Sequence, residues 1–100
     1  MGTTFNREKD ILKIKVDGRL DAATSEDFVV ETEKRIDDSL RSIEIDCSAL
    51  EYISSAGLRA FMALYDRICD GGGSITLHGV GEQVGDVLRM TGMNEVFTID

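Results

Sequence analysis

Residues 48–59 read Ser-Ala-Leu-Glu-Tyr-Ile-Ser-Ser-Ala-Gly-Leu-Arg, and this stretch is the most informative part of the sequence. Before it, a short apolar strand over residues 43–45 leads into a polar turn over residues 46–48. Within it, Ser54 and Ser55 open a helix, because a serine hydroxyl accepts a hydrogen bond from a main-chain N–H that a helix start leaves unpaired. A helix start also carries partial positive charge. A serine there is therefore both a good cap and a good place to add and remove a phosphate.

Upstream of this stretch, the sequence predicts a hairpin and a first helix. Residues 3–7 form a weak strand, residues 8–10 a polar turn, and residues 11–17 alternate between apolar and polar side chains, as in a strand with one face on the core. A loop follows over residues 18–24. Thr24 or Ser25 then caps a helix that runs to about residue 39, since Phe28, Thr32 and Ile36 recur at helical spacing.

Downstream, strands and helices alternate. Residues 42–47 form the second core strand, whose acidic side chains lie opposite its isoleucines, so that one face of the strand is expected to be uncovered. The helix that the two serines open ends at a run of three glycines, which supplies a left-handed C-cap. Its predicted buried stripe consists of Leu58, Phe61, Met62, Tyr65, Ile68 and Cys69.

Three further elements complete the chain. They are a strand over residues 74–78, a helix over residues 82–91 that ends at Gly92, and a short strand over residues 96–99. Strand–helix–strand units favour parallel pairing, whereas the opening hairpin is antiparallel. We therefore predict an α/β fold in which a mixed, mostly parallel sheet packs against about three helices, as a single domain over residues 1–100.

Composition excludes several classes of function. The formal net charge of −8 and the pI near 4.5 argue against a groove that binds nucleic acid and against binding to anionic lipid. The acidic charge is consistent with protein partners that have basic faces, or with the ordinary acidic surface of many cytosolic proteins. No run of about 18 apolar residues is present, so no membrane-spanning helix is expected. Cys47 and Cys69 suit a protein core and a reducing cytoplasm, and their spacing predicts no zinc site. No cofactor is expected.

The sequence does not favour an enzyme. A serine nucleophile needs a nearby base, and the single histidine, His78, falls at the end of a predicted strand. The serine pair lacks the preceding glycine of a nucleophile elbow. Gly79, Gly81 and Gly85 follow a strand, but their spacing misses the dinucleotide-binding fingerprint.

The region around the two serines resembles a known family. Asp46-x-Ser48-x-Leu50-x-x-Ile53-x-Ser55-x-Gly57-Leu58 resembles the signature of STAS domains, and more specifically that of the bacterial anti-sigma factor antagonists, also called anti-anti-sigma factors. The loop Gly18-x-Leu20-Asp21 and the stretch Val84-x-x-Val87-Leu88-x-x-Thr91-Gly92 are similar too. The resemblance covers almost the whole chain and implies the STAS fold.

The resemblance also implies a phosphorylation site. In the family, a partner kinase phosphorylates the serine that follows an aspartate, which corresponds here to Ser55. Ser54 stands where the aspartate is usual and Ala56 where a second Ser or Thr is usual. Ser54 can cap the helix but carries no charge, and phosphorylation of Ser54 itself stays open.

A partner-switching function follows from the resemblance. The unphosphorylated domain would bind an anti-sigma factor serine kinase and so release a sigma factor, and a PP2C-type phosphatase would reset it. The residues expected at the partner surface are Asp21, Thr24, Ser54, Ser55, Gly57, Leu58 and Arg59. Asp21 is expected beside the serine turn, because both follow strands that end at the same edge of a parallel sheet. Asp21 could instead be a turn residue, Ser55 only a cap, and Leu58 a core residue. As an alternative function, an unphosphorylated STAS domain would serve as a regulatory subunit of a transporter complex.

Overall fold

Five strands form one sheet in a computed structural model that describes residues 2–100. They are β1 (Gly2–Glu8), β2 (Ile11–Leu20), β3 (Ser42–Ile53), β4 (Ser74–His78) and β5 (Thr98–Ile99), and they lie side by side in that order. The β1–β2 hairpin is antiparallel, whereas β2, β3, β4 and β5 are parallel to one another. The predicted mixed, mostly parallel sheet is confirmed.

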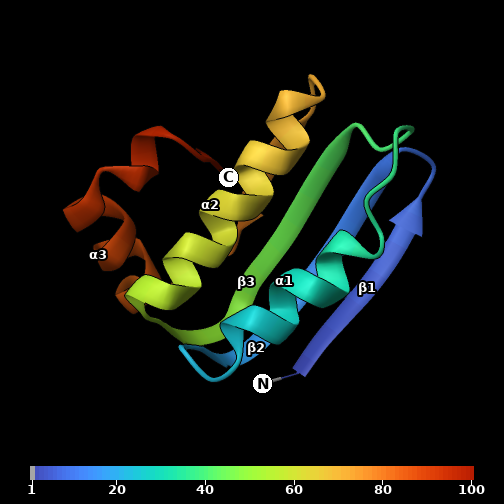
Figure 1. The fold of residues 1–100 in the computed structure, drawn as a ribbon. Helices are drawn as coiled ribbons and strands as arrows, with labels where there is room; N and C mark the ends of the chain where they lie inside the picture. The colour runs from blue at the N-terminus through green and yellow to red at the C-terminus, as the bar shows by residue number, and fades with distance from the viewer. Residues whose placement is uncertain (1) are drawn as a thin grey trace.

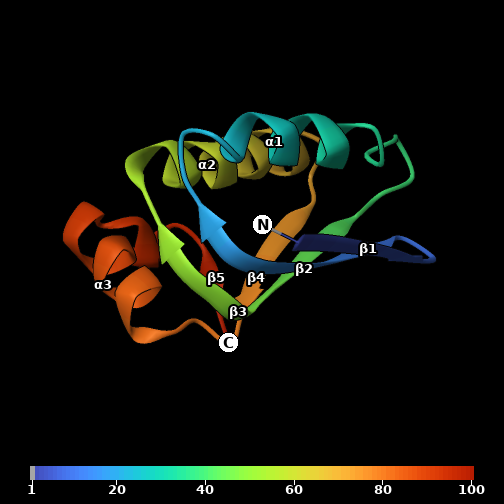
Figure 2. The ribbon, with the colours of Figure 1, turned by 90° about the horizontal axis from the view of Figure 1, so that it is seen from below.

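Two of the three α-helices cover one face of the sheet. α1 (Ser25–Glu33) and α2 (Ser55–Asp70) lie side by side over this face, and α3 (Glu82–Thr91) lies on the other side of α2 from α1 (Figures 1 and 2). A short 3₁₀ turn, Met93–Glu95, links α3 to β5. Among residues 2–100, no helix covers the opposite face of the sheet beneath α1 and α2 (Figure 2), as predicted for the acidic face of β3. That face carries charged and polar side chains, including Lys13, Lys15, Glu44 and His78.

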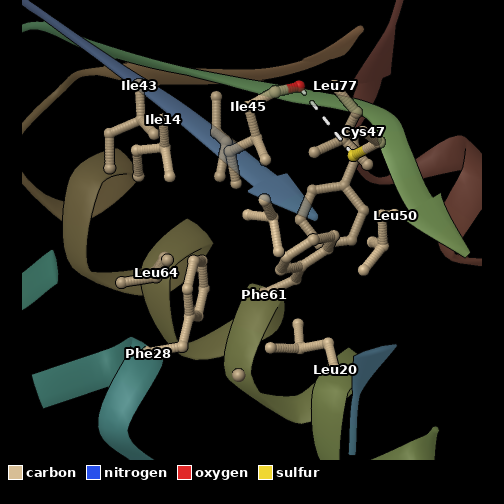
Figure 3. Packing of buried hydrophobic residues seen from close by; sticks show 14 of the residues in the cluster. Ile14, Leu20, Phe28, Ile43, Ile45, Cys47, Leu50, Phe61, Leu64 and Leu77 are labelled. Carbon is tan, nitrogen blue, oxygen red and sulfur yellow. Dashed lines mark hydrogen bonds between the residues drawn. The ribbon is translucent and has the colours of Figure 1, made fainter. Parts of the chain in front are cut away.

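The core lies between the sheet and the two covering helices. Alternate residues of the central strands point into it, because successive side chains of a strand project to opposite faces. Phe61 of α2 lies at its centre (Figure 3), with its ring centroid 5.9 Å from that of Phe28 and 6.2 Å from that of Phe97. Cys47 is completely buried, as predicted, and Cys69 packs at the edge of the core.

The turn predicted over residues 46–48 is wrong, because β3 continues through it to Ile53. The strand instead contains a β-bulge, in which two residues of β3, Cys47 and Ser48, lie opposite Val16 of β2. The Asp46 carboxylate accepts a hydrogen bond of 2.9 Å from the Ser48 N–H. Hydrogen bonds from the Ser48 hydroxyl and N–H lower the pKa of Asp46. Asp46 and Ser48 favour a turn, but in this protein they lie at a bulge. The reason is that β2 extends beyond its predicted end and pairs with the second half of β3, as far as Ile53.

Three further boundaries differ from prediction. β2 ends at Leu20 instead of residue 17, so the loop before α1 is shorter than expected. α1 ends at Glu33 instead of residue 39, because tighter turns follow it and the Asp37 carboxylate accepts a hydrogen bond from the Ser39 N–H. The short strand predicted over residues 96–99 covers only Thr98–Ile99.

The buried face of α2 and its C-terminal end also differ from the prediction. Its buried face includes Ala60 and Leu64, whereas Met62, predicted in the stripe, is 37% exposed. The C-cap Gly71 has a φ of −87°, and the left-handed residue is the next one, Gly72, with a φ of 83°.

Candidate functional site

The two adjacent serines have different roles where β3 passes into α2. Ser54 is the N-cap: its hydroxyl oxygen accepts a hydrogen bond of 3.3 Å from the Gly57 N–H, and its main chain is extended. Ser55 is the first residue of α2 and is exposed to solvent. Because Ser54 caps the helix, the Ser55 hydroxyl is not needed for that purpose. The sequence could not separate these roles, since either serine is a good cap.

The loop between β2 and α1 meets this turn at the same edge of the sheet. Leu20 pairs with Ile53, and the Leu20 carbonyl accepts a hydrogen bond of 3.0 Å from the Ser54 N–H. Asp21 directly follows Leu20. The expectation that Asp21 lies beside the serine turn is thus confirmed, and its cause is that two parallel strands end together.

The Asp21 carboxylate holds its own loop. Its Oδ1 accepts hydrogen bonds of 3.0 Å from the Ala23 N–H and 3.3 Å from the Thr24 N–H. The Thr24 hydroxyl accepts a bond of 3.0 Å from the Asp21 N–H, and it lies 3.0 Å from the Arg19 carbonyl oxygen, to which it can donate. Thr24 stands at the N-cap of α1 but makes no side-chain cap bond to that helix. These contacts give Asp21 and Thr24 a structural role in the loop.

Gly57 and Leu58 lie inside the protein. A Cβ atom on Gly57 would lie 2.5 Å from the Leu20 carbonyl oxygen and 2.7 Å from Ile53 Cγ1, so only glycine fits without a shift of the main chain. Leu58 is 6% exposed and belongs to the hydrophobic core. The prediction that Gly57 and Leu58 belong to a partner surface is therefore corrected. Both residues position the turn, and neither presents a side chain to a partner.

Arg59 is exposed one helical turn after Ser55. It lines a shallow groove between the starts of α1 and α2, together with Ser25, Glu26, Val29, Ala56, Ala60 and Ala63. Of the predicted partner residues, Ser55 and Arg59 are the two whose side chains are exposed, and they share one side of α2.

Sequence reasoning missed one contact to the turn. The side-chain amide of Gln83, at the start of α3, bonds to the main chain of Ile53: its Oε1 accepts from the Ile53 N–H at 2.9 Å, and its Nε2 donates to the Ile53 carbonyl at 3.3 Å. The contact joins residues 30 positions apart, and no local pattern marks it.

The fold keeps the histidine away from the serines. His78 pairs with Asp46 across β4 and β3, seven residues before the end of β3. Its ring nitrogens lie 3.1 Å from Glu44 Oε1 and 3.0 Å from Asp100 Oδ2. Within residues 2–100, no group of His, Cys, Asp and Glu side chains is placed to hold a metal ion. None of the helices in the same range is long and apolar enough to cross a membrane.

Comparison with known proteins gives consistent matches over this whole fold. The model of the STAS domain family matches residues 4–100. The chain is 25% identical to BtrV of Bordetella bronchiseptica over 99% of this chain and 85% of the relative. That relative is named "Putative anti-sigma factor antagonist BtrV". It is similar in structure to an anti-sigma factor antagonist from Mycobacterium paratuberculosis, with a TM-score of 0.86, 22% identity, and coverage of 98% of this chain and 83% of the other. It is also similar to the phosphorylated form of SpoIIAA, the Bacillus cell fate determinant, with a TM-score of 0.79, 14% identity, and coverage of 99% and 91%.

Proposed function

The chain belongs to the STAS domain family, and from this premise we propose that it is an anti-sigma factor antagonist controlled by phosphorylation of Ser55. One observation carries the proposal: Ser55 is exposed as the first residue of α2, while Ser54 supplies the cap. The name of the Bordetella relative supports the choice of partner, an anti-sigma factor. The phosphorylated SpoIIAA structure supports the type of switch.

The proposed cycle has two chemical steps. A kinase that is itself the anti-sigma factor transfers the γ-phosphoryl group of ATP to the Ser55 oxygen: the bond between the β–γ bridging oxygen and γ-phosphorus breaks, ADP leaves, and the hydroxyl proton is lost. A PP2C-type phosphatase then hydrolyses the phosphoserine to serine and inorganic phosphate. In this cycle the domain is a substrate and a binding protein, not a catalyst, and it works in the cytoplasm.

The start of α2 suits a phosphate. The partial positive charge there stabilises an anion, and no acidic residue occupies the first turn of α2. Arg59 adds a positive charge one turn away in a chain of net charge −8. The aspartate usual in the family would place a negative charge beside the phosphate. Ser54 caps the helix without that charge.

The phosphate would act on the partner's affinity. Phosphorylation adds about 1.5 to 2 negative charges. Burying such a charge against acidic groups of a partner costs several kcal/mol, and each ~1.4 kcal/mol is a tenfold change in affinity. One phosphate is therefore enough to separate a micromolar complex.

Affinity capture with three baits tests the proposal: the wild type, Ser55→Ala and Ser55→Asp. We expect Ser55→Ala to hold an ATP-dependent kinase that Ser55→Asp loses, and the wild-type bait to carry phosphate on Ser55 by mass spectrometry. Ser54→Ala is the matched control for the neighbouring hydroxyl and should still be phosphorylated. Recovery of transporter subunits that ignore both Ser55 changes, with no phosphate on Ser55, would overturn the proposal in favour of a transporter-regulatory domain.

A further inference from the structure

We propose that Gln83 is a positioning residue for the phosphoacceptor turn, an inference that rests on the proposed function. The residue lies on α3, whereas Ser55 begins α2. The contact between the two runs through the main chain of Ile53, the last residue of β3.

The N–H and carbonyl groups of Ile53 have no neighbouring strand on the β4 side, and Gln83 bonds to both of them. Pairing between β3 and β4 ends at Asp46, so Ile53 lies beyond the end of its neighbouring strand on that side. Ile53 is 1% exposed, so water does not replace the missing strand. The carboxamide of Gln83 both accepts from the Ile53 N–H and donates to the Ile53 carbonyl, as a residue of a neighbouring strand would.

The opposite edge of the same turn is held by β2. Successive main-chain groups of a strand point to alternate sides, and the Ser54 N–H accordingly points to β2 and bonds to the Leu20 carbonyl. The turn is thus held between β2 and α3 one residue before Ser55. Since Ser54 is the N-cap of α2, these contacts set where the helix begins and in which direction the Ser55 hydroxyl leaves it.

Removal of the carboxamide should loosen the turn without releasing α3. Val84 and Leu88 of α3 are fully buried and keep the helix docked. Gln83→Leu removes both hydrogen bonds, and Gln83→Glu replaces the donating amide nitrogen with a carboxylate oxygen that repels the Ile53 carbonyl oxygen. Glu82→Leu is the matched control, because Glu82 is exposed and adjacent on the same turn.

Hydrogen exchange measured by NMR tests the contact without any kinase. Gln83 is the only glutamine, and Asn6 and Asn94, the only asparagines, are both exposed. We expect the Gln83 side-chain amide protons to exchange more slowly than those of the asparagines. In Gln83→Leu, the Ile53 amide should exchange about tenfold faster, while Ile43 and Ile45 stay protected. In Glu82→Leu, Ile53 should stay protected. An unchanged Ile53 amide, or equal loss of protection across the whole sheet, would overturn the proposal.

Kinetics with the kinase captured by the Ser55→Ala bait test the positioning role. We expect Gln83→Leu to lower kcat for Ser55 phosphorylation about tenfold with KM changed by less than about twofold, and Glu82→Leu to leave kcat within about twofold of the wild-type value. A rise in KM alone, or an equal loss of kcat in Glu82→Leu, would overturn the role. If the bait captures no kinase, the proposed function fails, while the exchange experiment still decides whether Gln83 holds the turn.

Discussion

Gly57→Ala is the sharpest test of how the α2 start is built, because local and tertiary effects have opposite signs. In an isolated helix, alanine is more favourable than glycine by about 1 kcal/mol. In this protein the new Cβ atom would lie 2.5 Å from the Leu20 carbonyl oxygen, whereas ordinary contacts begin at 3.4 Å. The main chain would have to move by about 0.9 Å to relieve the contact. The Leu20 carbonyl is also the acceptor for the Ser54 N–H, so this movement strains the hydrogen bond that holds the turn.

The structure gives the size of the effect. Overpacking of this kind costs about 1–3 kcal/mol, and weakening one buried hydrogen bond adds about 1 kcal/mol. After the gain in helix propensity, the net loss in the free energy of unfolding is about 2 kcal/mol. For a domain of this size, that loss lowers the melting temperature by about 10 °C.

Urea denaturation of Gly57→Ala checks this value, and Gly71→Ala is the control. Gly71 has a φ of −87°, and a Cβ atom there would meet its nearest neighbour at 3.7 Å. The control should therefore be neutral or more stable by up to about 1 kcal/mol. If Gly57→Ala unfolds at the same urea concentration as the wild type, or at a higher one, close packing of α2 on Leu20 is not the reason for this glycine.

Two further predictions concern the neighbouring serines and the buried thiol. Ser54→Ala should lower the free energy of unfolding by about 1 kcal/mol, because the helix loses its cap. Ser55→Ala should change this free energy by less than about 0.5 kcal/mol. Equal effects of the two substitutions in urea denaturation would contradict the assigned roles. Burial raises the pKa of Cys47 from 9.0 to about 12, so the stability that the neutral thiol contributes is fully present below pH 9 and is lost as the pH rises toward 12. The stability difference between wild type and Cys47→Ala should therefore fall by about 1 kcal/mol between pH ~9 and ~10, and a constant difference would show that the thiol ionises freely in the folded state.

Local signals in the sequence predict much of this fold. The alternation over residues 11–17 and the serine before α2 act over a few positions, and both led to the right element. The sequence does not predict the second half of β3, because Asp46 and Ser48 are polar residues that favour a turn, and pairing with β2 makes this segment extended. Met62 was placed in the core because its spacing fits, yet Leu64 faces the sheet more directly.

The candidate site divides in the same way. Its exposed members, Ser55 and Arg59, follow from a motif that is continuous in the sequence. The contacts that hold them come from distant residues, such as Leu20 on β2 and Gln83 on α3, and depend on where strands end in space. Asp21 was predicted at the correct edge, but its carboxylate bonds within its own loop, a detail that main-chain geometry decides.

A helix start fixed in this manner favours a switch that works by charge. Ser54 is bonded to Leu20, Ile53 to Gln83, and Gly57 packs against the main chain of β2. None of these contacts uses the Ser55 hydroxyl, so a phosphate on that oxygen breaks none of them. The cost of the added charge is then small within the domain, where the start of α2 and Arg59 are favourable to an anion. Under the proposed function, the electrostatic effect of the phosphate is therefore expressed in the affinity for the partner and not in the stability of the domain.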